Sequence, residues 1–98
     1  MEQITKPTIK LLATGTKLVA KQMIANAGDL LPKHLATLES ILFVHEGECT
    51  LKINGEDKLL KQGDACIVPP QTKHQIKAET NFKGVHFMPK DIEFQFFE

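Results

Sequence analysis

Short runs of alternating polar and hydrophobic positions recur along this chain. The clearest run covers residues 48–53, which read ECTLKI. A period of two residues is typical of a β-strand with one buried face. Asn54 and Gly55 follow, and this pair favours a type I′ turn, in which both central residues have positive φ. The pattern therefore predicts a β-hairpin whose second strand covers residues 58–61.

Strand-length hydrophobic runs cover much of the remaining chain, and turn residues separate them. No window of eleven or more residues holds a convincing helical period. About nine short strands at close spacing indicate an all-β sandwich or barrel. The other predicted strands are residues 9–13, 17–25, 40–45, 65–68, 74–78, 82–88 and 92–97.

The length and composition fit one globular domain. The chain has 98 residues, of which 42% are hydrophobic and 24% charged, and this argues against disorder. Twelve acidic residues balance twelve basic ones, so no basic field indicates nucleic acid or a membrane surface. All the basic residues are lysines, which excludes bidentate guanidinium recognition of phosphate.

The cysteines and the N-terminal residues indicate a reducing compartment. Cys49 and Cys66 form no CxxC pair, and residues 1–10 are too polar for a signal peptide. No apolar run approaches the roughly 18 residues needed to span a bilayer. We therefore expect a cytoplasmic protein, with a disulfide only if the fold brings the two cysteines together.

Two segments place glycine and histidine at regular spacings. In residues 28–47 the order is Gly28, five residues, His34, one residue, Ala36, three residues, Ser40, six residues, Gly47. In residues 63–78 the order is Gly63, five residues, Pro69, one residue, Gln71, two residues, His74, three residues, Ala78.

These segments resemble the two signature motifs of the cupin superfamily, G-x5-H-x-H-x3-E-x6-G and G-x5-P-x-G-x2-H-x3-N. The resemblance extends over roughly residues 17–89. It implies a single cupin domain spanning residues 1–98, folded as an antiparallel double-stranded β-helix, or jelly-roll barrel. Such domains are often paired as dimers. The small core and the hydrophobic row near the end of the chain also predict a homodimer, with the N-terminal strand and residues 92–97 at its interface.

The resemblance implies a divalent metal held by three histidines and a glutamate, but two of these positions have changed. His34 and His74 remain, whereas Ala36 replaces the second histidine and Ser40 replaces the glutamate. A catalytic metal usually has three or more protein ligands, so we expect a weak site or none. The family implies Fe or Mn, whereas two imidazoles favour Zn or Ni.

His86 is the candidate third ligand. It lies in the predicted strand 82–88, where alternation leaves two orientations open. Either Gly84, His86 and Met88 face inward, or Val85 and Phe87 do. In the first case His86 joins the other two histidines, and in the second it lies on an outer or dimer face.

The sequence is compatible with three functions, of which one is enzymatic. The first is binding of a small molecule in a central cavity. The second is a metal-dependent oxygenase, isomerase or lyase that uses His34, His74 and His86. The third is a structural dimerising module, in which the hydrophobic row of Phe94 and Phe96 lies at the interface. The expected ligand contacts are Ala36, Ser40, Leu42, Val44 and Gln71.

Overall fold

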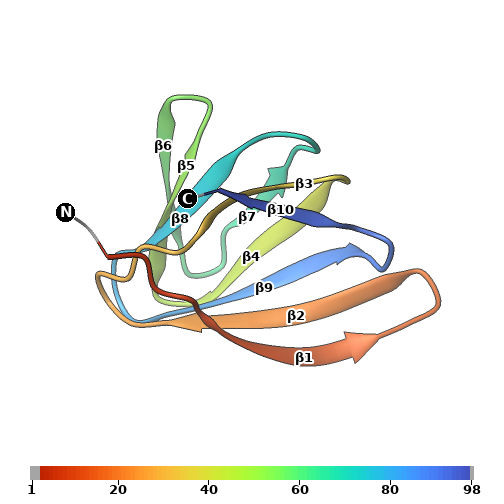
Figure 1. Ribbon diagram of the computed structural model, residues 1–98. Helices are drawn as coiled ribbons and strands as arrows, with labels where there is room; N and C mark the ends of the chain where they lie inside the picture. The colour runs from red at the N-terminus through yellow and green to blue at the C-terminus, as the bar shows by residue number, and fades with distance from the viewer. Residues whose placement is uncertain (1–2, 98) are drawn as a thin grey trace.

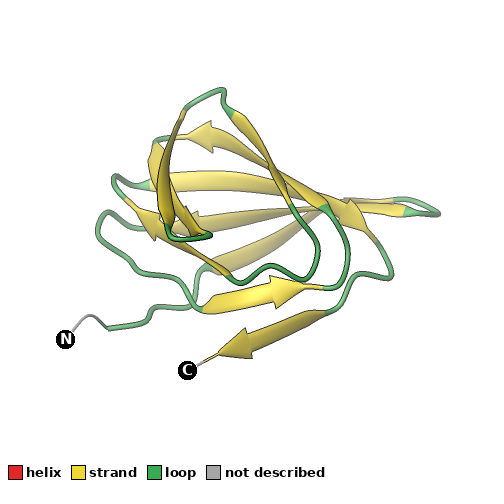
Figure 2. Cartoon of the chain, turned by 90° about the horizontal axis from the view of Figure 1, so that it is seen from above, coloured by secondary structure: helices red, strands yellow, loops and turns green. Residues whose placement is uncertain are grey.

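The computed structural model describes residues 3–97, and within this range the chain forms ten β-strands and no helix (Figures 1 and 2). The all-β class predicted from the sequence is confirmed. In residues 3–97 there is accordingly no helix long and apolar enough to cross a membrane. The strands are β1 (Thr8–Thr14), β2 (Leu18–Ala25), β3 (Lys33–Ala36), β4 (Ser40–Glu46), β5 (Glu48–Ile53), β6 (Glu56–Lys61), β7 (Ala65–Val68), β8 (His74–Ala78), β9 (Phe82–Pro89) and β10 (Phe94–Phe97).

The strands form two five-stranded sheets that pack face to face (Figure 1). Their orders are β1-β2-β9-β4-β7 and β10-β3-β8-β5-β6, and every pair within them is antiparallel. The chain crosses repeatedly between the sheets, which is the connectivity of a jelly-roll barrel. The sheets end at β1 and β10 on one side and at β7 and β6 on the other.

The short strand β3 was not predicted from the sequence. Its four residues, KHLA, do not alternate in polarity, and tertiary pairing determines their conformation. All four pair with β10, and His34 also pairs with His74 of β8. The strand therefore exists because two distant segments hold it.

The hydrophobic core lies between the sheets and follows the alternation of the strands. In β5 the inward residues Cys49, Leu51 and Ile53 are buried, as the period of two predicts. Leu42 and Val44 of β4 face them from the other sheet, together with Phe82. Cys49 and Cys66 are both free, and burial raises the pKa of the Cys49 thiol to about 12.

Two positions of positive φ explain parts of the motif spacing. Gly47 has φ +76°, and a Cβ atom there would overlap the carbonyl oxygen of Asn81, so only glycine fits. Gln71 has φ 56° at the place where the second motif has glycine. In the turn between β5 and β6, the two central residues both have positive φ: 54° for Asn54 and 73° for Gly55. This confirms the turn predicted from the sequence.

Candidate functional site

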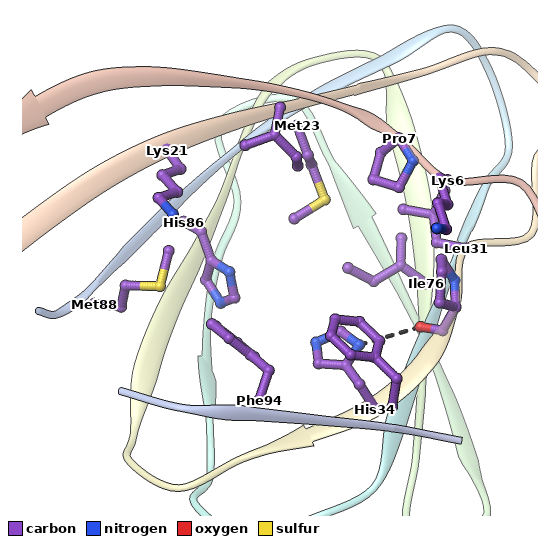
Figure 3. Close-up of a pocket in the computed structure, with 13 residues that line it drawn as sticks. Lys6, Pro7, Lys21, Met23, Leu31, His34, Ile76, His86, Met88 and Phe94 are labelled. Carbon is purple, nitrogen blue, oxygen red and sulfur yellow. Dashed lines mark hydrogen bonds between the residues drawn. The ribbon is translucent and has the colours of Figure 1, made fainter. Parts of the chain in front are cut away.

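A cavity of about 640 Å³ lies between the two sheets, on the side of their edge strands β1 and β10 (Figure 3). Side chains from β1, β2 and β9 form one wall, and side chains from β3, β8 and β10 form the other. This volume falls within the range of small-molecule sites. The main hydrophobic side chains that line it are Met23, Leu31, Ile76, Met88, Phe94 and Phe96.

His34 and His74 are neighbours because they form a direct cross-strand pair between β3 and β8. Their ring centroids are 4.3 Å apart in an edge-to-face arrangement. The Nδ1 atom of His34 donates a hydrogen bond to the carbonyl oxygen of Pro32 at 3.1 Å. His74 makes the same kind of bond to the carbonyl oxygen of Thr72 at 2.9 Å. Each neutral ring therefore carries its free lone pair on Nε2.

His86 faces inward, and this settles the two orientations left open by the sequence. Gly84, His86 and Met88 are buried, whereas Phe87 is 45% exposed on the outer face of the sheet. The Nε2 atom of His86 lies 2.9 Å from the hydroxyl oxygen of Ser40 and shares a hydrogen bond with it. The residue that stands at the glutamate position of the motif thus holds the third histidine.

The three imidazole rings are neutral at pH 7. Burial lowers the pKa of His34 and of His74. Burial also lowers the pKa of His86, to about 4, and the nearby His34 and His74 add to the effect. Among the residues that line the cavity, Lys6 and Lys21 are therefore the carriers of formal charge, and no Asp or Glu of the described chain lines it.

The phenylalanine rings of β10 lie close to the rings of two of these histidines. The Phe94 ring lies 5.6 Å from His34 and 6.3 Å from His86, measured between ring centroids. The Phe96 ring lies 5.3 Å from His34. Both phenylalanines line the cavity and are also exposed, so their predicted place at a dimer interface stays a prediction.

The structure distributes the sequence-predicted ligand contacts differently from the expectation. Ala36, Leu42 and Val44 are almost completely buried in the packed interior and do not line the cavity. Gln71 is exposed in a turn and does not line it either. Large side chains such as Phe82 fill the centre of the barrel, so the open space lies toward β1 and β10.

Several residues that line the cavity were not predicted from the sequence. Two of them, Lys21 and Met23, lie on one face of β2, which they share with Val19 and Ala25 by alternation. This face is regular because β2 pairs in regular register with β9. A lysine on the hydrophobic face of a strand was the signal available for Lys21. Leu31 and Met88 carried no such signal, since hydrophobic residues are ordinary in a core.

The donor atoms present do not fit a resident catalytic metal. The Nε2 atoms of His34 and His74 have the tautomer that metal ligation needs, with Nδ1 bonded to a carbonyl. The Nε2 atom of His86, in contrast, is engaged by Ser40. Residues 3–97 contain no group of three or more His, Cys, Asp or Glu side chains placed to hold a metal ion. The imidazoles of His34 and His74 are therefore the side-chain donors available to a metal ion.

The two packed antiparallel sheets with a cavity between them define a small double-stranded β-helix protein. Residues 21–88 match the family model described as "Cupin domain", and this is more than half of the chain. The chain belongs to the cupin family, which confirms the resemblance drawn from the motif spacing. No curated protein matches the sequence.

Solved structures with the same fold span several kinds of protein. An uncharacterized conserved protein with a double-stranded β-helix domain from Klebsiella pneumoniae is 21% identical, with a TM-score of 0.83 over 100% of this chain and 90% of that one. A cupin superfamily protein from Desulfitobacterium hafniense is 15% identical, with a TM-score of 0.79 over 93% and 84%. Salicylate 1,2-dioxygenase from Pseudoaminobacter salicylatoxidans, solved with gentisate adducts, is 18% identical, with a TM-score of 0.81 over 98% of this chain and 30% of that one. At these identities the likeness extends to the fold alone.

Proposed function

We propose that this protein binds a small, largely hydrophobic molecule in the cavity between its sheets. The observation that carries the proposal is the cavity itself, about 640 Å³ and lined mainly by Met, Leu, Ile and Phe side chains. Neutral His34 and His86 add a few polar contacts on opposite walls. Such a combination of a hydrophobic lining with a few fixed polar groups is typical of ligand sites.

A hydrophobic fluorescent probe tests the proposal. We expect N-phenyl-1-naphthylamine to bind with one site per chain and to raise the melting temperature. Met88→Trp places a large side chain in the cavity and should abolish binding. Phe87→Trp is the matched control, because the adjacent position on β9 points to the outer face and should leave binding unchanged.

Two results would contradict this function. One is a folded parent protein, verified by circular dichroism, that does not bind the probe. The other is unchanged binding in a folded Met88→Trp variant, which would place the probe outside the cavity. If Met88→Trp does not fold, Met23→Trp fills the same cavity from β2 and serves as the second variant.

A metal-dependent role is the second candidate, and one observation favours it. His34 and His74 adjoin each other, and both direct Nδ1 toward a backbone carbonyl. This pair would give a weak site for Zn²⁺ or Ni²⁺, since imidazole suits these metals and the other ligands would be water or an anion. Two imidazoles fall short of the three or more protein ligands of a catalytic metal, so this candidate is metal binding and not an oxygenase, isomerase or lyase activity. The family is the sole ground for considering Fe or Mn.

Calorimetric titration of Zn²⁺ and Ni²⁺ decides this second candidate. We expect weak binding by the parent protein and none by His34→Ala or His74→Ala. Replacement of His45, which is exposed on the outer face of β4, is the control. Equal binding by the parent and both site variants would refute the two-histidine site.

We also propose that the protein forms a homodimer through the outer face of the β1-β2-β9-β4-β7 sheet. Cross-strand pairing aligns Ile67 with Ile41, Ile41 with Phe87, and Phe87 with Ala20 in one hydrophobic row. Ile67, Ile41 and Phe87 are 53%, 40% and 45% exposed. A formal net charge of zero does not oppose association of two copies.

Light scattering of purified protein tests the dimer. We expect a dimer mass for the parent and a monomer mass for Ile41→Asp, because the new carboxylate would be buried without a partner. Leu59→Asp is the control, since Leu59 is 52% exposed on β6 of the other sheet. A monomer mass for the parent at micromolar concentration would contradict the proposal.

We retain the cytoplasm as the proposed location. Its support is that Cys49 and Cys66 are both free thiols in the fold. Cell fractionation of the untagged protein tests it, and recovery from the periplasmic or secreted fraction would overturn it.

A further inference from the structure

Lys21 is an exposed lysine that also lines the cavity. It lies on the inward face of β2, between Val19 and Met23, and pairs across the ladder with His86. Strand pairing on both sides, with β1 and with β9, fixes its backbone. Figure 3 shows Lys21 beside His86, whereas Lys6 lies at the other end of the cavity beside Leu31.

The surroundings of Lys21 offer its ammonium group no partner within the described chain. No Asp or Glu of residues 3–97 lines the cavity, and none of the ion pairs in this range includes Lys21. Apart from Lys6, the other side chains that line the cavity are hydrophobic or histidine. A solvent-exposed cation beside a hydrophobic cavity that no carboxylate lines is placed to pair with the anionic group of a molecule in that cavity.

We propose that Lys21 binds the anionic group of the ligand, so that the cavity takes a hydrophobic molecule with one carboxylate or similar acidic group. The hydrophobic part packs against Met23, Met88 and Phe94, and the acid lies at the Lys21 end of the cavity. This inference rests on the proposed function, since it names the ligand class of the same site. It assigns the acid to Lys21 rather than to Lys6, because Lys6 lies outside the strands on the segment before β1.

Two probes that differ by a single acidic group test the assignment. 8-Anilinonaphthalene-1-sulfonate is an anion, and N-phenyl-1-naphthylamine has the same aromatic framework without the sulfonate. Both are titrated into the parent, Lys21→Met, Lys21→Arg, Lys6→Met and Lys10→Met. Lys10 is the matched control, because it is an exposed lysine on β1 that does not line the cavity.

We expect Lys21→Met to weaken binding of the anionic probe about fivefold, the size expected for a partly solvated ion pair. Binding of the neutral probe should change by less than about twofold, since methionine retains the hydrophobic part of the lysine side chain. Lys21→Arg should keep the affinity for the anion, and Lys10→Met should leave both probes unaffected. Displacement of the neutral probe by decanoate but not by decanol would extend the result to carboxylates.

The outcomes separate this inference from the proposed function. Binding of neither probe by the folded parent would refute the proposed function. Binding of both probes with no effect of Lys21→Met would refute the role of Lys21 alone. A larger loss in Lys6→Met than in Lys21→Met would overturn the assignment to Lys21, and a parallel loss for both probes would reduce Lys21 to a packing residue.

Discussion

Acid should destabilise this protein through the buried imidazole of His86. The side chain is 8% exposed, and burial lowers its folded-state pKa to about 4 from the usual 6.5. Below pH 6.5 the unfolded chain takes up a proton at His86 that the folded chain does not. The free energy of unfolding therefore falls as the pH drops from 6.5 toward 4, whereas at pH 8 the group has no effect.

The size of this effect follows from the two pKa values. Their difference corresponds to about 3 kcal/mol when the pH is below both, and to about 2.5 kcal/mol at pH 4.5. With a typical urea dependence for a small domain, this lowers the midpoint of unfolding by about 1–2 M. The lowered pKa values of His34 and His74 act in the same direction.

His86→Gln isolates the contribution of His86, because glutamine retains a polar group for Ser40 but does not titrate. Urea unfolding is followed by far-UV circular dichroism, since the chain contains neither Trp nor Tyr. We expect the parent to lose about 2.5 kcal/mol more stability between pH 8 and pH 4.5 than His86→Gln does. Equal losses in the two proteins would refute the reasoning.

Three further outcomes follow from packing and exposure. Ser40→Ala should lower the free energy of unfolding by about 1–2 kcal/mol in a urea titration, because it removes the hydrogen-bond partner of buried His86. Gly47→Ala should cost more than about 2 kcal/mol in the same titration, since a Cβ would meet a backbone carbonyl at a positive φ; an unchanged midpoint would contradict this. A disulfide-exchange reagent should modify Cys66 in the native protein and Cys49 only after denaturation, because Cys49 is fully buried with a raised pKa.

The fold could be predicted because local signals agreed with one another. The alternation in residues 48–53 and the turn at Asn54 and Gly55 specify a hairpin without help from the rest of the chain. The glycine spacing then added a tertiary signal, since Gly47 is required where the chain meets a distant backbone. Strand β3 was missed because pairing with β10, more than fifty residues later, determines it.

The candidate site was predictable only in part. His34 and His74 could be expected together from the two motifs, and the structure pairs them directly. The position of the cavity could not be predicted, because it depends on how large side chains such as Phe82 fill the centre of the barrel. The alternation in β9 could not predict whether His86 faces inward, because either orientation of the strand places hydrophobic residues in the interior.

Strand β1 has a consequence for how a molecule reaches the cavity. It is exposed at all seven positions and, within residues 3–97, pairs only with β2, yet its Ile9 belongs to the cavity wall. Strands with few buried contacts open locally at a small fraction of the global unfolding free energy. Amide protons of β1 should thus exchange with solvent faster than those of the central strand β8. If a molecule binds in the cavity as proposed, it should slow the exchange in β1, because Ile9 of this strand belongs to the cavity wall.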